Sequence, residues 1–238
     1  MSSGRTPRLY TDQLLSEGRE VELGPDAARY LGSVMRLGPG AEVLLFDDRT
    51  GEWRCEIGAI NKRSVAAIPQ ERLRPRETPP DIWLCAAPIR RQRYEWIAEK
   101  ACELGAARLV PVRTAFTQER GIRSERLRAH MIEAAEQCER TALPELAATQ
   151  SLAELLDSWP DERALIFCDE TGGEKALAAM PGAPAAILIG PEGGFSPEER
   201  ERIRSHPKAI GISLGPRILR ADTAAVAALA LWQELHGQ

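Results

Sequence analysis

Hydrophobic residues follow two different periods along the chain, and the change falls near residue 75. Between residues 9 and 70, short apolar runs alternate with polar turns, a pattern typical of strands. The runs lie at residues 42–46, 53–60 and 64–68, and helical spacing before them predicts a helix at 25–37 that Gly38 closes. Because short strands in so small a unit favour a sheet that curls on itself, we expect a small β-barrel-like domain.

A proline-rich polar stretch at residues 72–80 separates this part from one in which strand-like and helix-like segments alternate. We therefore expect two domains, 1–74 and 75–238. In the second domain we expect strands at 81–86, 108–112, 165–168, 185–189 and 209–214, and helices at 93–104, 124–140, 197–205 and 222–235. Such alternation predicts an α/β fold, a parallel sheet with helices on both faces.

Composition argues against several classes of protein. The chain has 238 residues, 43% of them hydrophobic, and no run of 18 or more apolar residues, so we expect a cytoplasmic protein without a membrane segment. Its five cysteines include no C-x-x-C pair, and we expect them to be reduced and buried. Its three histidines lack the spacing of metal ligands, so no metal site is expected.

The net charge of −4 argues against a nucleic-acid partner, but arginines gather in two places. Local potential, rather than total charge, governs binding to phosphate. The two clusters are Arg72, Arg74, Arg76, Arg90, Arg91 and Arg93, and then Arg113, Arg120, Arg123, Arg126 and Arg128. Composition leaves two interpretations open: a phosphate-binding surface, or solvated helix faces such as the one in which Glu125 is interleaved with arginines.

Two glycine-marked loops carry the strongest indication of function. Residues 190–194 (GPEGG) and 214–220 (LGPRILR) each follow a short apolar run with the character of a buried strand. Glycine lets bare backbone approach a flat ligand closely, so two such loops indicate one small-molecule pocket. The P-loop and dinucleotide-binding patterns are both absent, and Glu192 would repel a phosphate.

Helix starts are expected directly after both loops. Ser196, Pro197 and Glu199 predict an N-cap, a first-turn proline and a capping box. Asp222 or Thr223 can cap the last helix of the chain. These signals have a structural explanation and do not by themselves indicate a ligand.

Side chains of the second loop suit an adenine-sized ligand. Ile218 and Leu219 can face an aromatic ring while backbone amides bond its edges. Arg220 can orient an anionic group or stabilise developing negative charge. Arg217 fits a surface salt bridge equally well.

Residues 189–196 (IGPEGGFS) and 213–224 (SLGPRILRADTA) resemble the bacterial 16S ribosomal RNA (uracil-N3)-methyltransferases, a family of the SPOUT class. Segments at 34–40, 96–105 and 133–140, the last followed by Pro144 and Glu145, agree in the same order, so the resemblance spans nearly the whole chain. The chain departs from the family at Asp222, where glutamate is usual, and at Glu139, where a smaller polar residue is usual.

The resemblance implies a PUA-like RNA-binding domain, then a SPOUT-type parallel sheet tied in a trefoil knot, in a homodimer whose pocket lies at the subunit interface. It implies S-adenosyl-L-methionine as cofactor and the small-subunit ribosomal RNA, naked or assembled, as partner. The implied cofactor-binding residues are Cys168, Asp169, Glu170, Leu188, Ile189, Gly190, Pro191, Gly193, Gly194, Leu214, Gly215, Ile218, Leu219, Arg220, Thr223 and Ala224. Candidate RNA contacts, each of which also fits a solvated surface, are Arg8, Arg36, Lys62, Arg63, Arg90 and Arg91.

Methyl transfer to uracil N3 requires loss of the imide proton, because the protonated nitrogen has no in-plane lone pair. Glu192 is the candidate base, with Asp222 or solvent as alternatives, and Arg220 would stabilise the oxygen that gains charge. Three other functions stay open: a SPOUT ribose 2'-O-methyltransferase, a catalytically silent RNA-binding ribosome-assembly factor, and an α/β nucleotide-binding module. The sequence does not indicate which uridine is modified.

Overall fold

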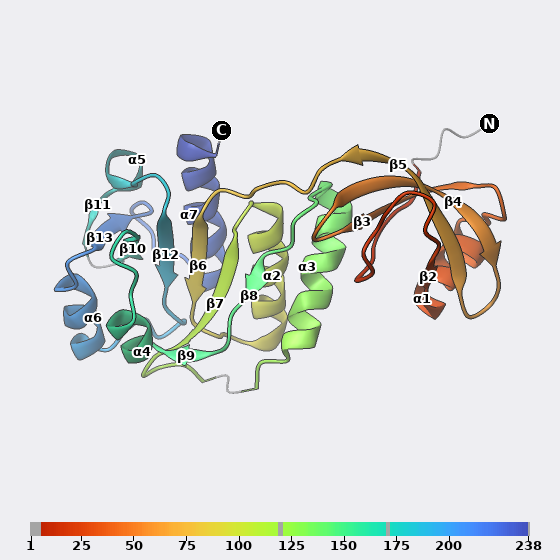
Figure 1. Ribbon diagram of the computed structural model, residues 1–238. Helices are drawn as coiled ribbons and strands as arrows, with labels where there is room; N and C mark the ends of the chain where they lie inside the picture. Colours follow the sequence, from red (N-terminus) through yellow and green to blue (C-terminus); the bar gives the residue numbers. More distant parts are fainter. Residues whose placement is uncertain (1–5, 119–120, 170–171, 238) are drawn as a thin grey trace. The chain divides into compact units, whose positions relative to one another are not determined.

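A computed structural model describes residues 6–118, 121–169 and 172–237, and it divides into two compact units (Figure 1). The N-terminal unit consists of residues 1–78 and 135–143, and the C-terminal unit of residues 79–134 and 144–238. The N-terminal unit thus includes a segment, 135–143, that the sequence pattern places in the second domain.

The N-terminal unit contains a five-stranded sheet with the strand order β1-β3-β4-β5-β2. Its strands are β1 (Arg8–Tyr10), β2 (Val21–Leu23), β3 (Glu42–Asp47), β4 (Gly51–Ile60) and β5 (Val65–Arg74). β1 pairs with β3 in parallel, and the other pairs among these described strands are antiparallel. Val43, Leu45 and Ile57 alternate toward a common core and are fully buried, as the period-2 pattern predicts. The expected small β domain is confirmed.

The helix expected at residues 25–37 begins where predicted but ends earlier and changes type. α1 (Pro25–Ala28) passes directly into the π-helical turn η1 (Arg29–Val34). The chain then turns at Arg36, whose φ is 57°. Arg36, rather than Gly38, therefore takes the left-handed conformation that ends this segment.

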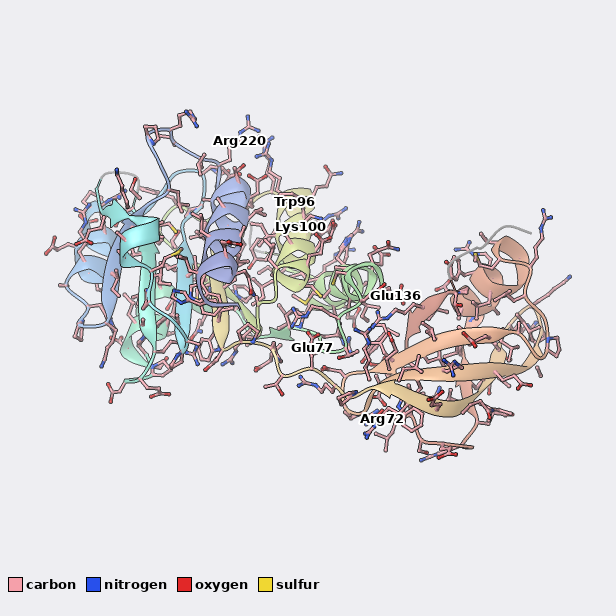
Figure 2. All side chains as sticks on the ribbon, turned by 90° about the horizontal axis from the view of Figure 1, so that it is seen from above. Arg72, Glu77, Trp96, Lys100, Glu136 and Arg220 are labelled. Atoms are coloured by element: carbon pink, nitrogen blue, oxygen red, sulfur yellow. The ribbon has the colours of Figure 1, made fainter. Side chains whose placement is uncertain are left out.

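Residues 135–143 join the N-terminal unit through specific hydrogen bonds. The segment begins in the last turn of α3 (Ser124–Cys138), where the Glu136 carboxylate, labelled in Figure 2, accepts a bond of 3.0 Å from the backbone N–H of Tyr10. Farther along, the backbone N–H of Leu143 donates to Asp48 Oδ1 at 3.0 Å. These bonds satisfy backbone donors of the small sheet and of the segment itself.

The C-terminal unit contains a larger sheet with the order β11-β13-β10-β12-β6-β7-β8, and β9 pairs with β7. Its strands are β6 (Ile82–Ala86), β7 (Arg108–Arg113), β8 (Glu145–Leu146), β9 (Gln150–Ser151), β10 (Ala164–Cys168), β11 (Glu174–Lys175), β12 (Ala185–Ile189) and β13 (Ala209–Ser213). All the pairs among these described strands are parallel. The predicted parallel α/β sheet is confirmed, whereas the trefoil knot stays a prediction.

Helices cover both faces of this sheet (Figure 1). The helices are α2 (Arg91–Glu103), α3, α4 (Leu152–Asp157), α5 (Ala176–Ala179), α6 (Pro197–Arg204) and α7 (Ala221–His236). On one face, Leu155 of α4 and Ile203 of α6 share a core with Leu188 of β12. Since neighbouring side chains of a strand point to opposite faces, Ile187 points to the other face, where α7 packs against β12 and α2. The short elements β8, β9, β11, α4 and α5 were not predicted, because they are too short to show a period.

The five cysteines form no disulfide, but the burial of two of them differs from the expectation. Cys55, Cys85 and Cys102 are buried, and burial raises the pKa of the Cys55 and Cys85 thiols to about 12. Cys138, at the end of α3, is exposed and Cys168 is only partly buried, although both were expected to be buried. The described residues include no helix long and apolar enough to cross a membrane, and no metal-binding cluster of His, Cys, Asp or Glu.

Asp47 organises the turn that follows β3. Its buried carboxylate accepts hydrogen bonds from the backbone of Leu15 at 2.7 Å and of Arg49 at 2.9 Å, and from the hydroxyl of Thr50 at 2.9 Å. Burial alone would raise the pKa of this carboxyl, but the donated hydrogen bonds outweigh it and hold the pKa below its usual value.

We expect Asp47→Asn to lower the free energy of unfolding by about 1–3 kcal/mol, because an amide nitrogen cannot accept the bonds that buried donors now make. Urea unfolding of the full chain measures this change. Asp26→Asn is the matched control, since the Asp26 side chain is 99% exposed, and it should leave the stability unchanged. Equal stability of the two variants would contradict the role given to Asp47.

Candidate functional site

Three loops converge at one edge of the C-terminal sheet because the strands before them are parallel neighbours. β10 lies between β12 and β13, and Phe167 is in register with Leu188 and Gly211. The carboxyl ends of all three strands therefore lie next to one another at the same edge of the sheet. In open parallel sheets, ligands bind at such carboxyl ends.

A cavity of about 390 Å³ lies among these loops. Most of the sequence-predicted cofactor residues line it: Cys168, Asp169, Ile189, Gly190, Pro191, Gly193, Gly194, Leu214, Gly215, Ile218, Leu219, Arg220 and Ala224. Leu188 and Thr223 do not line it, and Leu188 is fully buried in the core. Glu170 lies outside the described residues. The two glycine-marked loops thus share one cavity, as predicted.

Glycine is required at two positions of these loops. A Cβ on Gly190 would lie 2.8 Å from the ring of Phe195, which is closer than real contacts allow. Gly215 has a φ of 116°, a conformation that side chains rarely permit. The first loop ends in α6 with the capping box predicted for Ser196 and Glu199, since each side chain accepts from the other's backbone N–H.

Asp169 lines the cavity, but its carboxylate already forms ion pairs with two arginines of the protein. It is 4% exposed and forms ion pairs with Arg200 at 2.8 Å and with Arg204 of the same helix. The carboxylate therefore anchors α6 to the end of β10. A cofactor contact by Asp169, which lines the cavity, stays a prediction.

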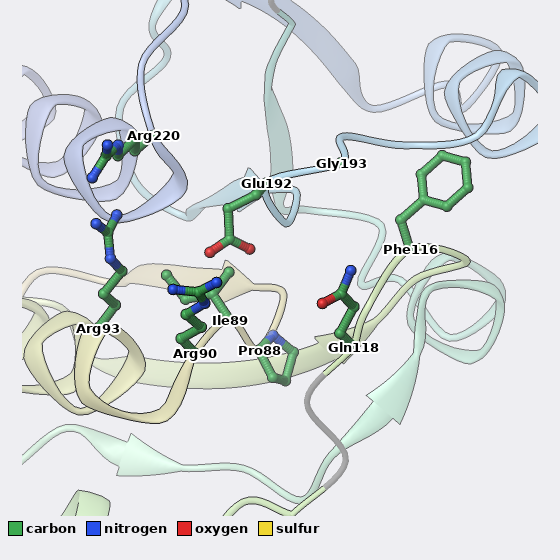
Figure 3. Close-up of a pocket in the computed structure, with 9 residues that line it drawn as sticks. All are labelled: Pro88, Ile89, Arg90, Arg93, Phe116, Gln118, Glu192, Gly193 and Arg220. Carbon is green, nitrogen blue, oxygen red and sulfur yellow. The ribbon is translucent and has the colours of Figure 1, made fainter.

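A second cavity of about 900 Å³ adjoins the first (Figure 3). Its lining residues are Pro88, Ile89, Arg90, Arg93, Phe116, Gln118, Glu192, Gly193 and Arg220. Glu192, Gly193 and Arg220 line both cavities. The two residues predicted to be catalytic, Glu192 and Arg220, therefore lie where a small-molecule cavity meets a larger basic one.

The start of α7 differs from the prediction. Arg220 occupies the N-cap position without a side-chain capping bond, so neither Asp222 nor Thr223 caps the helix. Asp222 instead pairs with Arg93 of α2 at 3.3 Å. This ion pair holds Arg93 at the wall of the larger cavity.

Sequence alone indicated only part of the larger cavity. Arg93 belongs to an arginine cluster recognised in the sequence, and Arg90, a candidate RNA contact, lines the cavity. Arg91 pairs with Glu95 at 3.4 Å and does not line it. Phe116 and Gln118 were missed, because nothing near them in the sequence marks a ligand site.

The candidate RNA contacts of the N-terminal unit divide into two kinds. Arg36, Lys62 and Arg63 are exposed. The side chain of Arg8 is 7% exposed, forms an ion pair with Glu52, and donates to backbone carbonyls of residues 135 and 140 at 2.7 and 2.6 Å. The prediction for Arg8 is therefore wrong, because its guanidinium is already bound inside the protein.

Comparison with known proteins gives matches along most of the chain. The family of RNA methyltransferase domains matches residues 76–233, and the family of RNA methyltransferase PUA domains matches residues 23–70. The ribosomal RNA small subunit methyltransferase E of Rickettsia conorii is 30% identical over 229 residues, covering 94% of this chain and 93% of that protein. The Bacillus subtilis protein of the same name is 27% identical over 235 residues, covering 92% and 91%.

Solved structures agree with these matches. A putative methyltransferase from Legionella pneumophila, in complex with bound SAM, has a TM-score of 0.88 at 30% identity and covers 98% of this chain and 99% of that one. A ribosomal RNA small subunit methyltransferase E from Neisseria gonorrhoeae, bound to S-adenosyl methionine, has a TM-score of 0.84 at 29% identity and covers 98% of each chain. The resemblance seen in the sequence motifs is confirmed. The chain belongs to the ribosomal RNA small subunit methyltransferase E family and is an RNA methyltransferase.

Proposed function

We propose that this protein transfers the methyl group of S-adenosylmethionine to N3 of one uridine in small-subunit (16S) ribosomal RNA. The meeting of two cavities at Glu192 and Arg220 carries the proposal. The smaller one suits a cofactor, and the larger one has three arginines in its wall, which suits a nucleotide of RNA. The names of the relatives support the same substrate class.

The residues of the smaller cavity fit S-adenosylmethionine. Gly190 and Gly215 bring bare backbone to the cavity wall, while Ile218 and Leu219 offer apolar surface for a flat ring. When bound, the cofactor supplies the methyl group as an electrophilic carbon on a sulfonium. Glu192 and Arg220 then lie at the boundary toward the larger cavity, where the reacting end is required.

Glu192 is the proposed acceptor of the N3 proton. Asp222, the alternative, is already paired with Arg93 at 3.3 Å and is less available for this role. The Arg220 guanidinium is exposed at the same junction and can donate to the uracil oxygen on which negative charge develops. Both side chains therefore act on the base before and during transfer.

RNA affinity requires cations away from the reacting atoms. We propose Arg36, Lys62 and Arg63 of the N-terminal unit and Arg90 of the C-terminal unit as phosphate contacts, in a reaction that takes place in the cytoplasm. We further propose a homodimer. Its support is Ile218, which is 87% exposed on a cofactor loop, where a second subunit would cover it.

The position of the methyl group tests the function. The product RNA is digested to nucleosides, and mass spectrometry distinguishes N3-methyluridine from a 2'-O-methylated nucleoside. The expected product is N3-methyluridine. A 2'-O-methylated product would instead assign the ribose methyltransferase activity, and a protein that binds RNA without transferring methyl would be an assembly factor.

Arg220→Ala is expected to lower kcat by about 100- to 1000-fold, because one donor to the developing oxyanion is lost. Calorimetric titration should show nearly unchanged affinity for S-adenosylmethionine. Arg202→Ala removes an arginine from a surface ion pair with Asp157 and should keep full activity. Turnover by Arg220→Ala close to that of the native protein would refute the proposed role.

Gly190→Ala is expected to weaken S-adenosylmethionine binding by about 10-fold or more, since the new methyl group would push the Phe195 ring from its place. Equilibrium titration with the cofactor measures the effect. The control is Gly24→Ala, because a Cβ on Gly24 meets nothing within 4 Å and its φ of −74° suits any residue. Unchanged cofactor affinity in Gly190→Ala would argue against this cavity as the cofactor site.

Free uridine is expected not to be a substrate, because the reaction depends on phosphate contacts and on the shape of a folded RNA. Methyl transfer from isotope-labelled S-adenosylmethionine is compared for uridine and for small-subunit ribosomal RNA from cells that lack this protein. Efficient methylation of the nucleoside would contradict the need for the RNA-binding residues.

A further inference from the structure

Phe116 lines the larger cavity and is largely exposed to solvent. It follows β7 in the sequence, and the residue is 47% exposed, although phenylalanine is among the residues most often buried. Phe116, Gly193 and Glu192 line the cavity together, and Figure 3 shows the phenyl ring at the edge of this group, beyond Gly193 and directed away from Glu192. Hydrophobic surface that stays open in a ligand cavity is available for stacking against a flat partner.

Hydrogen bonds made by the residues before and after Phe116 in the sequence hold its loop in place. The backbone N–H of Thr114 donates to the Thr117 hydroxyl at 2.9 Å, and the backbone N–H of Thr117 donates to the carbonyl of Thr114 at 3.1 Å. The backbone N–H of Ala115 donates to Glu199 Oε1 at 2.7 Å. Phe116 is therefore presented by an ordered turn rather than by a loosely held one.

Glu199 also connects this turn to the cofactor loop. Its second carboxylate oxygen, Oε2, accepts from the backbone N–H of Ser196 at 3.0 Å in the capping box. A Cβ on Gly193 would lie 3.1 Å from Cβ of Phe116, so the two loops are in close contact. One carboxylate thus fixes the position of Phe116 relative to the segment that contains Glu192.

We propose that Phe116 stacks on the target uracil at the edge of the cavity that Glu192 also lines, an inference that rests on the function proposed above. A base whose ring nitrogen reacts must leave its helical stack, and proteins receive such bases on aromatic side chains. A phenyl ring has no hydrogen-bonding group, so stacking leaves the edge of the base free for Glu192 and Arg220. Gln118, from the same loop, supplies an amide donor and acceptor at the cavity wall for that edge.

An alternative role for Phe116 is simple packing against Gly193. Packing needs apolar volume, which leucine also supplies, whereas stacking needs a flat aromatic ring. The two roles therefore predict different results for aliphatic and aromatic replacements.

The test compares Phe116→Leu and Phe116→Ala with Phe116→Tyr and Phe116→Trp, using small-subunit ribosomal RNA as substrate. Stacking predicts that kcat/KM falls about 10- to 100-fold in the two aliphatic variants and stays within about 3-fold of the native value in the two aromatic ones. Affinity for S-adenosylmethionine should be unchanged in all four, which also shows that each variant is folded. Full activity of Phe116→Leu, or equal losses in the aromatic variants, would overturn the proposal.

A second measurement detects stacking without methyl transfer. Small-subunit ribosomal RNA that contains 5-iodouridine is bound to the protein and irradiated, because this base crosslinks to aromatic rings stacked on it. Mass spectrometry should find the adduct on Phe116 in the native protein and not in Phe116→Leu. Adducts confined to other peptides would overturn the proposal even if the native protein methylates N3, whereas a Phe116 adduct in a protein that transfers no methyl would leave the stacking role standing and refute the proposed function alone.

Discussion

The parallel register of the large sheet determines where chemistry can occur in this protein. β10 pairs with β12 and β13, and these three strands bring the walls of the smaller cavity together at their carboxyl ends. The pairing continues through β6 and β7, where Ala86 is in register with both Ile189 and Pro111. The segments that follow β6 and β7 therefore reach the same edge and build the larger cavity. The two cavities, which we propose as the cofactor and substrate sites, are neighbours because their strands are neighbours.

The sequence predicted the smaller cavity well because its signals are local. The glycines at 190 and 215 and the capping box at Ser196 each act within a few residues of their own position. The larger cavity was only partly predicted, since Phe116 and Arg93 join it through the order of β6, β7 and β12 in the sheet. A period in the sequence identifies a strand, but it carries no information on which strand lies beside it.

Charged residues were the least predictable part of the site, because their partners are distant in the sequence. Arg8 has its carboxylate partner 44 residues away in Glu52, and Asp169 binds a helix more than thirty residues later. Both were expected to face a ligand, and the side chains of both are buried in ion pairs. Removing a charge from water costs free energy unless a partner of opposite charge offsets it. A buried charged side chain is therefore held in place by its ion pairs within the protein. Residue type alone does not distinguish the buried, paired side chains of Arg8 and Asp169 from exposed ones such as Arg36.

The ion pair between Arg93 and Asp222 illustrates how pairing shapes the electrostatics of the larger cavity. The cavity wall contains three arginines and the Glu192 carboxylate. Because Asp222 offsets the charge of Arg93, the field at the junction is set mainly by Arg90, Arg220 and Glu192. In the proposed reaction, two cations are then left to attract phosphate and an oxygen with developing charge, and one carboxylate is left to take a proton. A chain with a net charge of −4 can therefore present a locally positive site to RNA, since what matters is the charge left unpaired at the cavity wall.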